Sequence, residues 1–161
     1  MKTVQPSAEV LRQIKAKRQQ IYAALGKEYA SVIKAGALTW PIGNSIVHAS
    51  MSMDLTSILS YSNSPKGSEV SLSGLVICGP REDEPLHTHP PAIIGFIEYG
   101  SGRLLTVKNK REVALPFRSH DIVIIPSNAP HSFTTSVDKE FRYNALLIGP
   151  KGGNYQAHYF D

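Results

Sequence analysis

Hydrophobic residues near the start of the chain recur at helical spacing. Between Ser7 and Leu25 they lie three, four or seven positions apart, which puts them on one face of an amphipathic helix. Ser7 suits the N-cap of this helix, and Gly26 suits the position after its last residue. We therefore predict an N-terminal helix that packs against the outside of the core or across a dimer partner.

The hydrophobic pattern changes after Trp40-Pro41, where short apolar runs alternate with turn residues. The predicted strands are residues 45–50, 54–61, 69–78, 85–89, 92–99, 103–108, 112–116, 121–125, 131–135 and 141–148. Many short strands at regular spacing are typical of a β-sandwich or a β-barrel. We expect a helical segment at residues 1–35 and an all-β domain at residues 36–161, which together form one globular unit.

The composition fits a globular protein and argues against two classes of partner. Of the 161 residues, 42% are hydrophobic and 19% are charged. The net charge of +4 comes mainly from the predicted helix and from residues 108–111, where no aromatic residues interleave with the basic ones. We therefore expect no nucleic-acid partner. Residues 1–30 contain no continuous apolar stretch, so we expect no signal peptide or membrane span, and a cytoplasmic protein.

Three histidines form the candidate chemical site. His87 and His89 are separated by one residue, so in an extended strand both side chains project to the same face. Imidazole is a common ligand for divalent transition metals, but two imidazoles alone make a weak site. His131 follows a turn at residues 126–130 and opens a strand of its own. We predict that these three side chains bind one divalent transition-metal ion.

Two stretches of the chain resemble the motifs of the cupin family. PLHTHPPAIIGFIEYGSG at residues 85–102 is similar to the first cupin motif, and HDIVIIPSNAPHSF at residues 120–133 is similar to the second. The resemblance implies a double-stranded β-helix, a jelly-roll barrel, preceded here by the N-terminal helix. It also implies that His87, His89 and His131 are the metal ligands.

The chain departs from these motifs at several positions. Ile93 stands where the family usually has a glutamate ligand, and Glu98, the nearby acid, is predicted to be a surface or interface residue because it lies on the opposite face from Ile93. In the second motif His120 and Asn128 replace two usual glycines. Asn tolerates positive φ, so we expect Asn128 to keep its turn and His120 to be a solvent-side residue.

Three neutral ligands leave a bound ion with its full charge and with open coordination positions. Such a site favours anionic or chelating oxygen ligands, and a substrate with one chelating end and an apolar body would suit it. Tyr99 is the candidate catalytic residue, and it would join the inner face if the alternation of residues 93, 95 and 97 continued to it. The predicted substrate-contacting residues are Ile93, Gly95, Ile97, Phe133 and Tyr143, with Arg142 as an alternative to Tyr143 if the last strand has the other phase.

Several functions remain open. The cupin resemblance implies a non-haem iron dioxygenase first, while zinc, nickel or manganese would suit a redox-inert lyase or isomerase. Loss of the glutamate is also what a non-catalytic cupin that binds or senses a small molecule would show. We expect a homodimer, because the amphipathic helix and the edge strands need covering. His158 lies outside both motifs and is expected to be structural or exposed.

Overall fold

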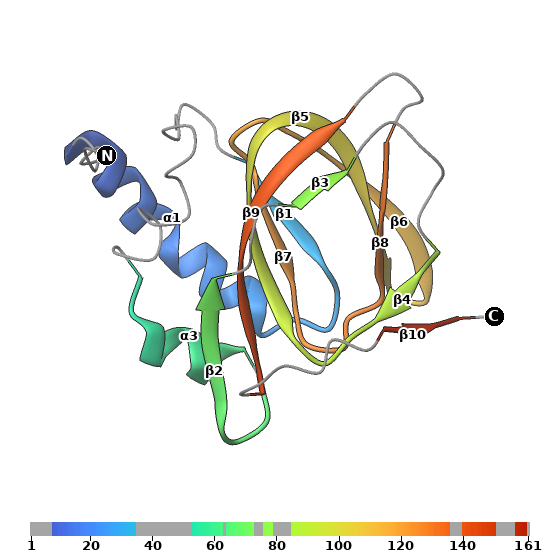
Figure 1. Ribbon diagram of the computed structural model, residues 1–161, viewed down its shortest axis with the longest axis horizontal. Helices are drawn as coiled ribbons and strands as arrows, with labels where there is room; N and C mark the ends of the chain where they lie inside the picture. The colour runs from blue at the N-terminus through green and yellow to red at the C-terminus, as the bar shows by residue number, and fades with distance from the viewer. Residues whose placement is uncertain are drawn as a thin grey trace.

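The computed structural model describes residues 8–34, 53–62, 64–72, 76–78, 85–135, 140–150 and 157–160. The elements in these ranges are α1 (Ala8–Leu25), β1 (Ser31–Ile33), α3 (Leu55–Tyr61), β2 (Ser68–Leu72), β3 (Val76–Cys78), β4 (His87–Thr88), β5 (Ala92–Lys108), β6 (Arg111–Arg118), β7 (Ile122–Ile125), β8 (His131–Thr134), β9 (Phe141–Pro150) and β10 (His158–Tyr159). All the described strand pairs are antiparallel. The strands form the predicted double-stranded β-helix barrel, with the helices beside it (Figure 1).

Strand β5 is the long central strand of the barrel. Its first half pairs with β7 and β9, and its second half pairs with β6 and β8. The sequence predicts two strands here, at residues 92–99 and 103–108, and this prediction is wrong because the strand is continuous. Gly100 has φ +91°, and a Cβ on it would overlap the backbone oxygen of Glu140. The glycine therefore lets the strand bend closely past β9 instead of ending it.

A β-bulge between Ile97 and Tyr99 changes which residues of β5 face the barrel interior. Before the bulge, Ile93 and Ile97 belong to the interior cluster; after it, the interior residue is Leu104. One extra residue in a strand exchanges the two faces beyond it. Tyr99 therefore does not continue the inward row that residues 93, 95 and 97 begin, and 37% of its surface is exposed.

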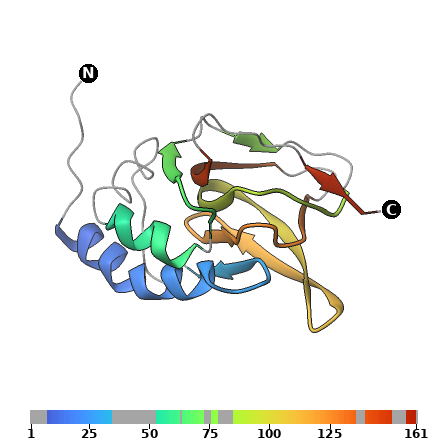
Figure 2. The same cartoon turned by 90° about the horizontal axis from the view of Figure 1, so that it is seen from below.

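The helices cover the outer face of one sheet (Figure 2). Ile21 and Leu25 of α1 and Ile58 of α3 are fully buried against outward residues of β5, β7 and β9. Burying a side chain of this size stabilises the fold by roughly 1.5–3 kcal/mol. The predicted helix is confirmed and ends at Leu25, while its expected cap Ser7 and the side chains of residues 8–14 lie outside the described part. Neither described helix has the length and apolar character of a membrane span.

Helix α3 corrects a second prediction, because residues 54–61 were expected to form a strand. Asp54 caps the helix: its carboxylate accepts hydrogen bonds from the Thr56 amide at 3.0 Å and the Ser57 hydroxyl at 2.7 Å. Tyr22 of α1 stacks on Tyr61 with 5.1 Å between the ring centroids. The capping aspartate and the packing against α1 outweigh the strand propensity of this short segment.

Other strand boundaries differ in smaller ways. The predicted strand at residues 69–78 is divided between β2 and β3, which both pair with β9, and residues 45–50 lie outside the described part. Strands β1 and β10 were not predicted. Strand β1 pairs with β7, so residues 31–33 of the N-terminal segment belong to the barrel sheet.

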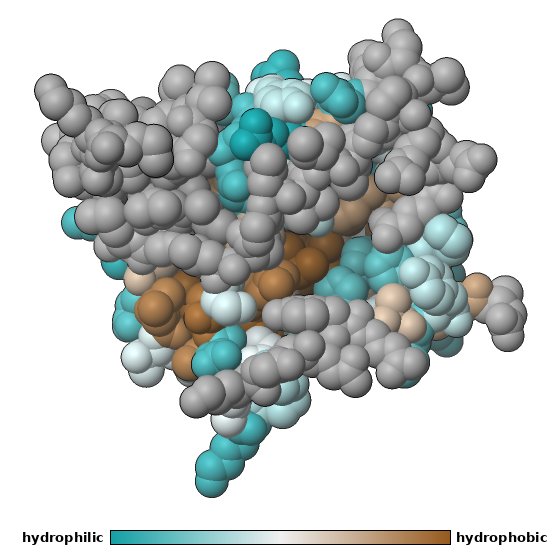
Figure 3. All heavy atoms as spheres, viewed as in Figure 1, coloured by the Kyte–Doolittle hydropathy of each residue, from teal (hydrophilic) through white to brown (hydrophobic). Residues whose placement is uncertain are grey.

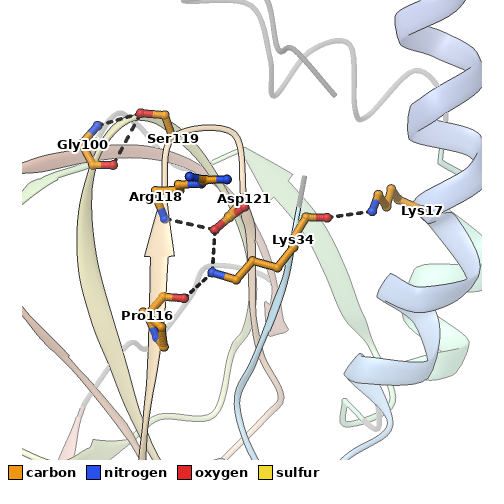
Figure 4. Close-up of polar contacts among 7 residues, drawn as sticks. All are labelled: Lys17, Lys34, Gly100, Pro116, Arg118, Ser119 and Asp121. Carbon is orange, nitrogen blue, oxygen red and sulfur yellow. Dashed lines mark hydrogen bonds and ion pairs between the residues drawn. The ribbon is translucent and has the colours of Figure 1, made fainter. Parts of the chain in front are cut away.

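A polar network joins the middle of α1, through Lys34 after β1, to the turn between β6 and β7 (Figure 4). The buried carboxylate of Asp121 accepts hydrogen bonds from the Arg118 amide at 3.0 Å and from Lys34 Nζ at 3.1 Å. Lys17 donates in turn to the Lys34 carbonyl at 2.7 Å. In the same turn His120 has φ +76°, which explains why the motif usually has glycine there. The side chain of His120 is partly exposed.

Candidate metal centre

The three histidines converge at the end of the barrel formed by β4 and β8. His87 of β4 lies directly opposite His131 of β8, and His89 follows β4 by one residue. The ring centroid of His131 lies 4.4 Å from that of His87 and 4.5 Å from that of His89. One nitrogen from each ring lies within 4.8 Å of the other two. The predicted meeting of the three imidazoles is therefore observed, and the cluster could hold a metal ion.

Hydrogen bonds fix the same tautomer in all three rings. Each Nδ1 lies 2.8 Å from a backbone carbonyl two residues away: His87 to Pro85, His89 to Pro91 and His131 to Ala129. A carbonyl only accepts hydrogen bonds, so each Nδ1 must carry a proton, and in the neutral form of each ring Nε2 carries the lone pair. This is the arrangement that orients histidines as metal ligands through Nε2.

Burial also favours the metal-binding form of the site. His131 is only 2% exposed, and this burial lowers the pKa of its imidazole from 6.5 to about 3, with smaller contributions from His89 and His87. The hydrogen bond to Ala129 acts in the opposite direction but does not outweigh the burial. The His131 ring is therefore neutral at neutral pH, and a neutral imidazole can bind a metal without first losing a proton. The donor set fits a divalent transition-metal ion.

Two loops that lie beside the ligands are hydrogen-bonded to each other. The backbone N–H of Asn128 donates to the His89 carbonyl at 2.9 Å, and the Ser127 hydroxyl donates to the Pro90 carbonyl. Asn128 has φ +59°, so the expectation that it keeps the turn is confirmed. These contacts hold the segment before His131 against the segment after His87.

Thr106 of β5 is hydrogen-bonded to the turn that precedes His131. Its buried hydroxyl donates to the Pro130 carbonyl at 3.0 Å and accepts from the Ala30 amide at 3.0 Å. Thr106 lies directly opposite His131 in the β5–β8 pair. The position of His131 is thus coupled to the segment that leaves α1.

The predicted substrate-contacting residues gather in the barrel interior. Phe133 follows His131 by two residues on β8 and packs against Tyr143, with 5.6 Å between the ring centroids. A Cβ on Gly95 would lie 3.2 Å from the Tyr143 ring, so the glycine makes room for that ring. Ile93 and Ile97 belong to the same interior cluster. In the space-filling view hydrophobic side chains occupy the middle of the face and hydrophilic ones lie beside them over β4 and β8 (Figure 3). Contact of these residues with a substrate stays a prediction.

In strand β9 the side chain of Tyr143 points into the barrel and that of Arg142 points outward. Glu98 lies on the outer face with Arg142, but it is only 3% exposed within its own chain, so the prediction of a surface or interface residue is wrong. Its carboxylate pairs with Arg142 Nε at 3.2 Å and accepts a hydrogen bond from the Asn144 amide group. A carboxylate is tolerated in a buried position when such partners accompany it. The sequence contained one indication of this buried carboxylate, because Arg142 and Asn144 are polar residues on the same face of β9.

The sequence analysis did not identify one aromatic residue that lies near the histidines. Tyr159 of β10 has its ring centroid 5.4 Å from that of His87. The two-residue strand β10 is too short to give a periodic pattern, so the sequence contained no usable signal for it. His158, its neighbour, is exposed as expected. The proposed catalytic role of Tyr99 stays a prediction.

Comparisons with known proteins agree with this architecture. The sequence profile described as AraC-like ligand binding domain matches residues 69–151. No curated protein matches the chain.

Three similar solved structures illustrate the range of neighbours. The polyketide cyclase RemF from Streptomyces resistomycificus is 17% identical with a TM-score of 0.45, over 62% of this chain and 76% of that chain. An uncharacterized conserved protein with a double-stranded beta-helix domain from Klebsiella pneumoniae is 15% identical with a TM-score of 0.44, over 61% and 78%. A cupin-like protein from Thermotoga maritima is 21% identical with a TM-score of 0.41, over 58% and 65%. Similarities this distant carry no argument about activity.

Proposed function

The chain belongs to the AraC-like ligand binding domain family, and we propose that it binds a small organic molecule at a divalent transition-metal ion held by His87, His89 and His131. The observation that carries this proposal is the shared tautomer of the three rings. Each Nδ1 is bonded to a backbone carbonyl, so the three Nε2 lone pairs remain as ligands for one ion.

The chain's own residues determine what kind of molecule fits. Ile93 provides no carboxylate, so the three ligands are neutral and a bound ion keeps its full positive charge. When bound, the ion would act as a Lewis acid toward an anionic oxygen and, if it were iron, would supply redox chemistry. Phe133 and Tyr143 would bind an apolar body in the barrel and exclude water from it.

Among enzymatic reactions we propose that of a non-haem iron dioxygenase first. The basis is the set of three neutral histidine ligands, which the cupin resemblance associates with that class. Zinc, nickel or manganese in the same site would instead suit a lyase or an isomerase. Tyr99 is kept as the catalytic candidate, although its side chain lies outside the inward row of β5.

A second function is favoured by the family itself. The matching profile is that of a ligand binding domain, and this description favours a chain that binds or senses a small molecule without converting it. A ligand recovered unchanged after incubation with the metal-loaded protein would support this second function. Chemical conversion of the ligand would support the enzyme.

We further propose that the protein acts in the cytoplasm as a homodimer. Helix α1 covers the outer face of its own barrel, so the need to bury the helix no longer supports a dimer. The remaining support is β10, which is an edge strand of the described sheet. Sedimentation equilibrium on the full chain would give the mass of a monomer if this proposal is wrong.

The metal content of protein purified without chelators tests the central proposal. His89→Ala removes one ligand, and His158→Ala is the matched control because that imidazole is exposed and lies outside the cluster. We expect one ion per chain in the wild type and in His158→Ala, and much less in His89→Ala. Iron would favour the dioxygenase, and zinc or nickel would favour the redox-inert reactions. Equal metal content in both variants would contradict the site.

A further inference from the structure

Four side chains form one row across four neighbouring strands at the candidate metal centre. In the register of the sheet, Thr106 of β5 lies opposite His131 of β8, His131 lies opposite His87 of β4, and His87 lies opposite Tyr159 of β10. Directly opposite residues of antiparallel strands project to the same face of a sheet. Tyr159 therefore faces the same side as the two histidines, and it is the last residue of the row.

The contacts of β10 agree with this register. The rings of Tyr159 and His87 are 5.4 Å apart at an interplanar angle of 44°. The Phe160 amide donates to the Leu86 carbonyl at 3.2 Å, which continues the pairing of β10 with β4. The side chain of Tyr159 nevertheless remains 61% exposed, so its ring lies where the site meets solvent.

We propose that Tyr159 contacts the molecule bound at the three-histidine site, an inference that rests on the proposed function. The ring covers the bound molecule on the solvent side, while Phe133 and Tyr143 border it inside the barrel. The phenol group donates a hydrogen bond to an anionic oxygen of that molecule. The class of ligand that fits is a small oxygen anion, such as a carboxylate, with a planar apolar body.

Phe160, which directly follows β10, provides a matched control. It is the next residue, it has a side chain of similar size, and it is 54% exposed. Successive residues of a strand project to opposite faces, so Phe160 points away from the face that carries His87. A change at Phe160 therefore removes an exposed aromatic ring next to β10 without touching the proposed ligand.

The experiment compares the wild type with Tyr159→Phe, Tyr159→Ala and Phe160→Ala, each loaded with cobalt(II). The dissociation constants of benzoate and acetate are measured from the visible absorption spectrum of the bound cobalt. Tyr159→Phe loses only the hydroxyl, so both anions should bind about five- to tenfold more weakly. Tyr159→Ala also loses the ring, so benzoate should weaken by about a further three- to tenfold. Phe160→Ala should bind both anions like the wild type.

The outcomes separate this inference from the function on which it rests. If the wild type bound no cobalt, the proposed function would fail and this inference would fail with it. Cobalt binding with equal anion affinities in all four proteins would overturn the role of Tyr159 alone. Equal weakening in Tyr159→Ala and Phe160→Ala would also overturn it, because the effect would then belong to the strand and not to one side chain.

Discussion

The metal-free protein should lose stability as the pH falls below neutrality, because of His131. The pKa of this imidazole is about 3 in the folded chain and 6.5 as the unperturbed value. The folded state therefore holds a neutral ring at a pH where the unfolded chain has already bound a proton. The contribution of the neutral His131 ring to the free energy of unfolding is fully present above pH 6.5, and it is lost as the pH falls from there toward 3.

The size of the effect follows from the two pKa values. Proton linkage gives a loss of about 2 kcal/mol in the free energy of unfolding between about pH 7 and about pH 5. That is a substantial part of the total stability of an ordinary domain, which is roughly 5–15 kcal/mol. Other titrating groups contribute to the same pH range, so the effect of His131 must be isolated by difference.

The assay is urea unfolding of chelator-treated protein at both pH values, in the wild type and in His131→Gln. Glutamine cannot take up a proton, so the variant keeps the contributions of all other groups and lacks that of the imidazole. We expect the wild type to lose about 2 kcal/mol more than the variant over this range. Equal losses in the two proteins would show that His131 is accessible to protons in the fold, and the burial argument would be refuted.

Three further substitutions test the bend of β5, the buried ion pair on its outer face and the turn before His131. Gly100→Ala should destabilise the fold by about 3 kcal/mol or more in chemical unfolding, because its Cβ would meet the Glu140 backbone; wild-type stability would mean that β5 does not bend there. Glu98→Gln should cost about 2 kcal/mol by weakening the pair with Arg142, whereas the exposed Glu112→Gln should cost nothing measurable; equal effects would refute the buried pair. Thr106→Val should lower metal affinity about tenfold in a chelator competition, because it frees the turn before His131; unchanged affinity would remove Thr106 from the site.

The features that the sequence predicted correctly depend on local patterns. The His-x-His pair needs only the alternation of a strand, and the turn before His131 needs only residues that tolerate their backbone angles. Helix α1 follows from the spacing of its apolar residues. In each case the residues that determine the structure lie close together in the sequence, within a single helix, strand or turn. A short window of sequence therefore contains the information.

The predictions that failed depend on contacts between distant segments. Glu98 is buried because Arg142 and Asn144 lie beside it on β9. The bulge before Tyr99 arises from the pairing of β5 with β9, and alternation within β5 cannot reveal it. Helix α3 forms where its cap and its packing on α1 outweigh a strand-like pattern. Tyr159 reaches the site only through the pairing of β10 with β4.

The nitrogen NMR spectrum of the histidine rings tests the central claim most directly. In the metal-free protein the rings of His87, His89 and His131 should carry their proton on Nδ1, as the carbonyl contacts require. Titration with zinc should then shift Nε2 of these three among the six histidines, and the shifts should be complete at one ion per chain. Protonated Nε2 atoms in these rings, or zinc-dependent shifts confined to other histidines, would contradict the account.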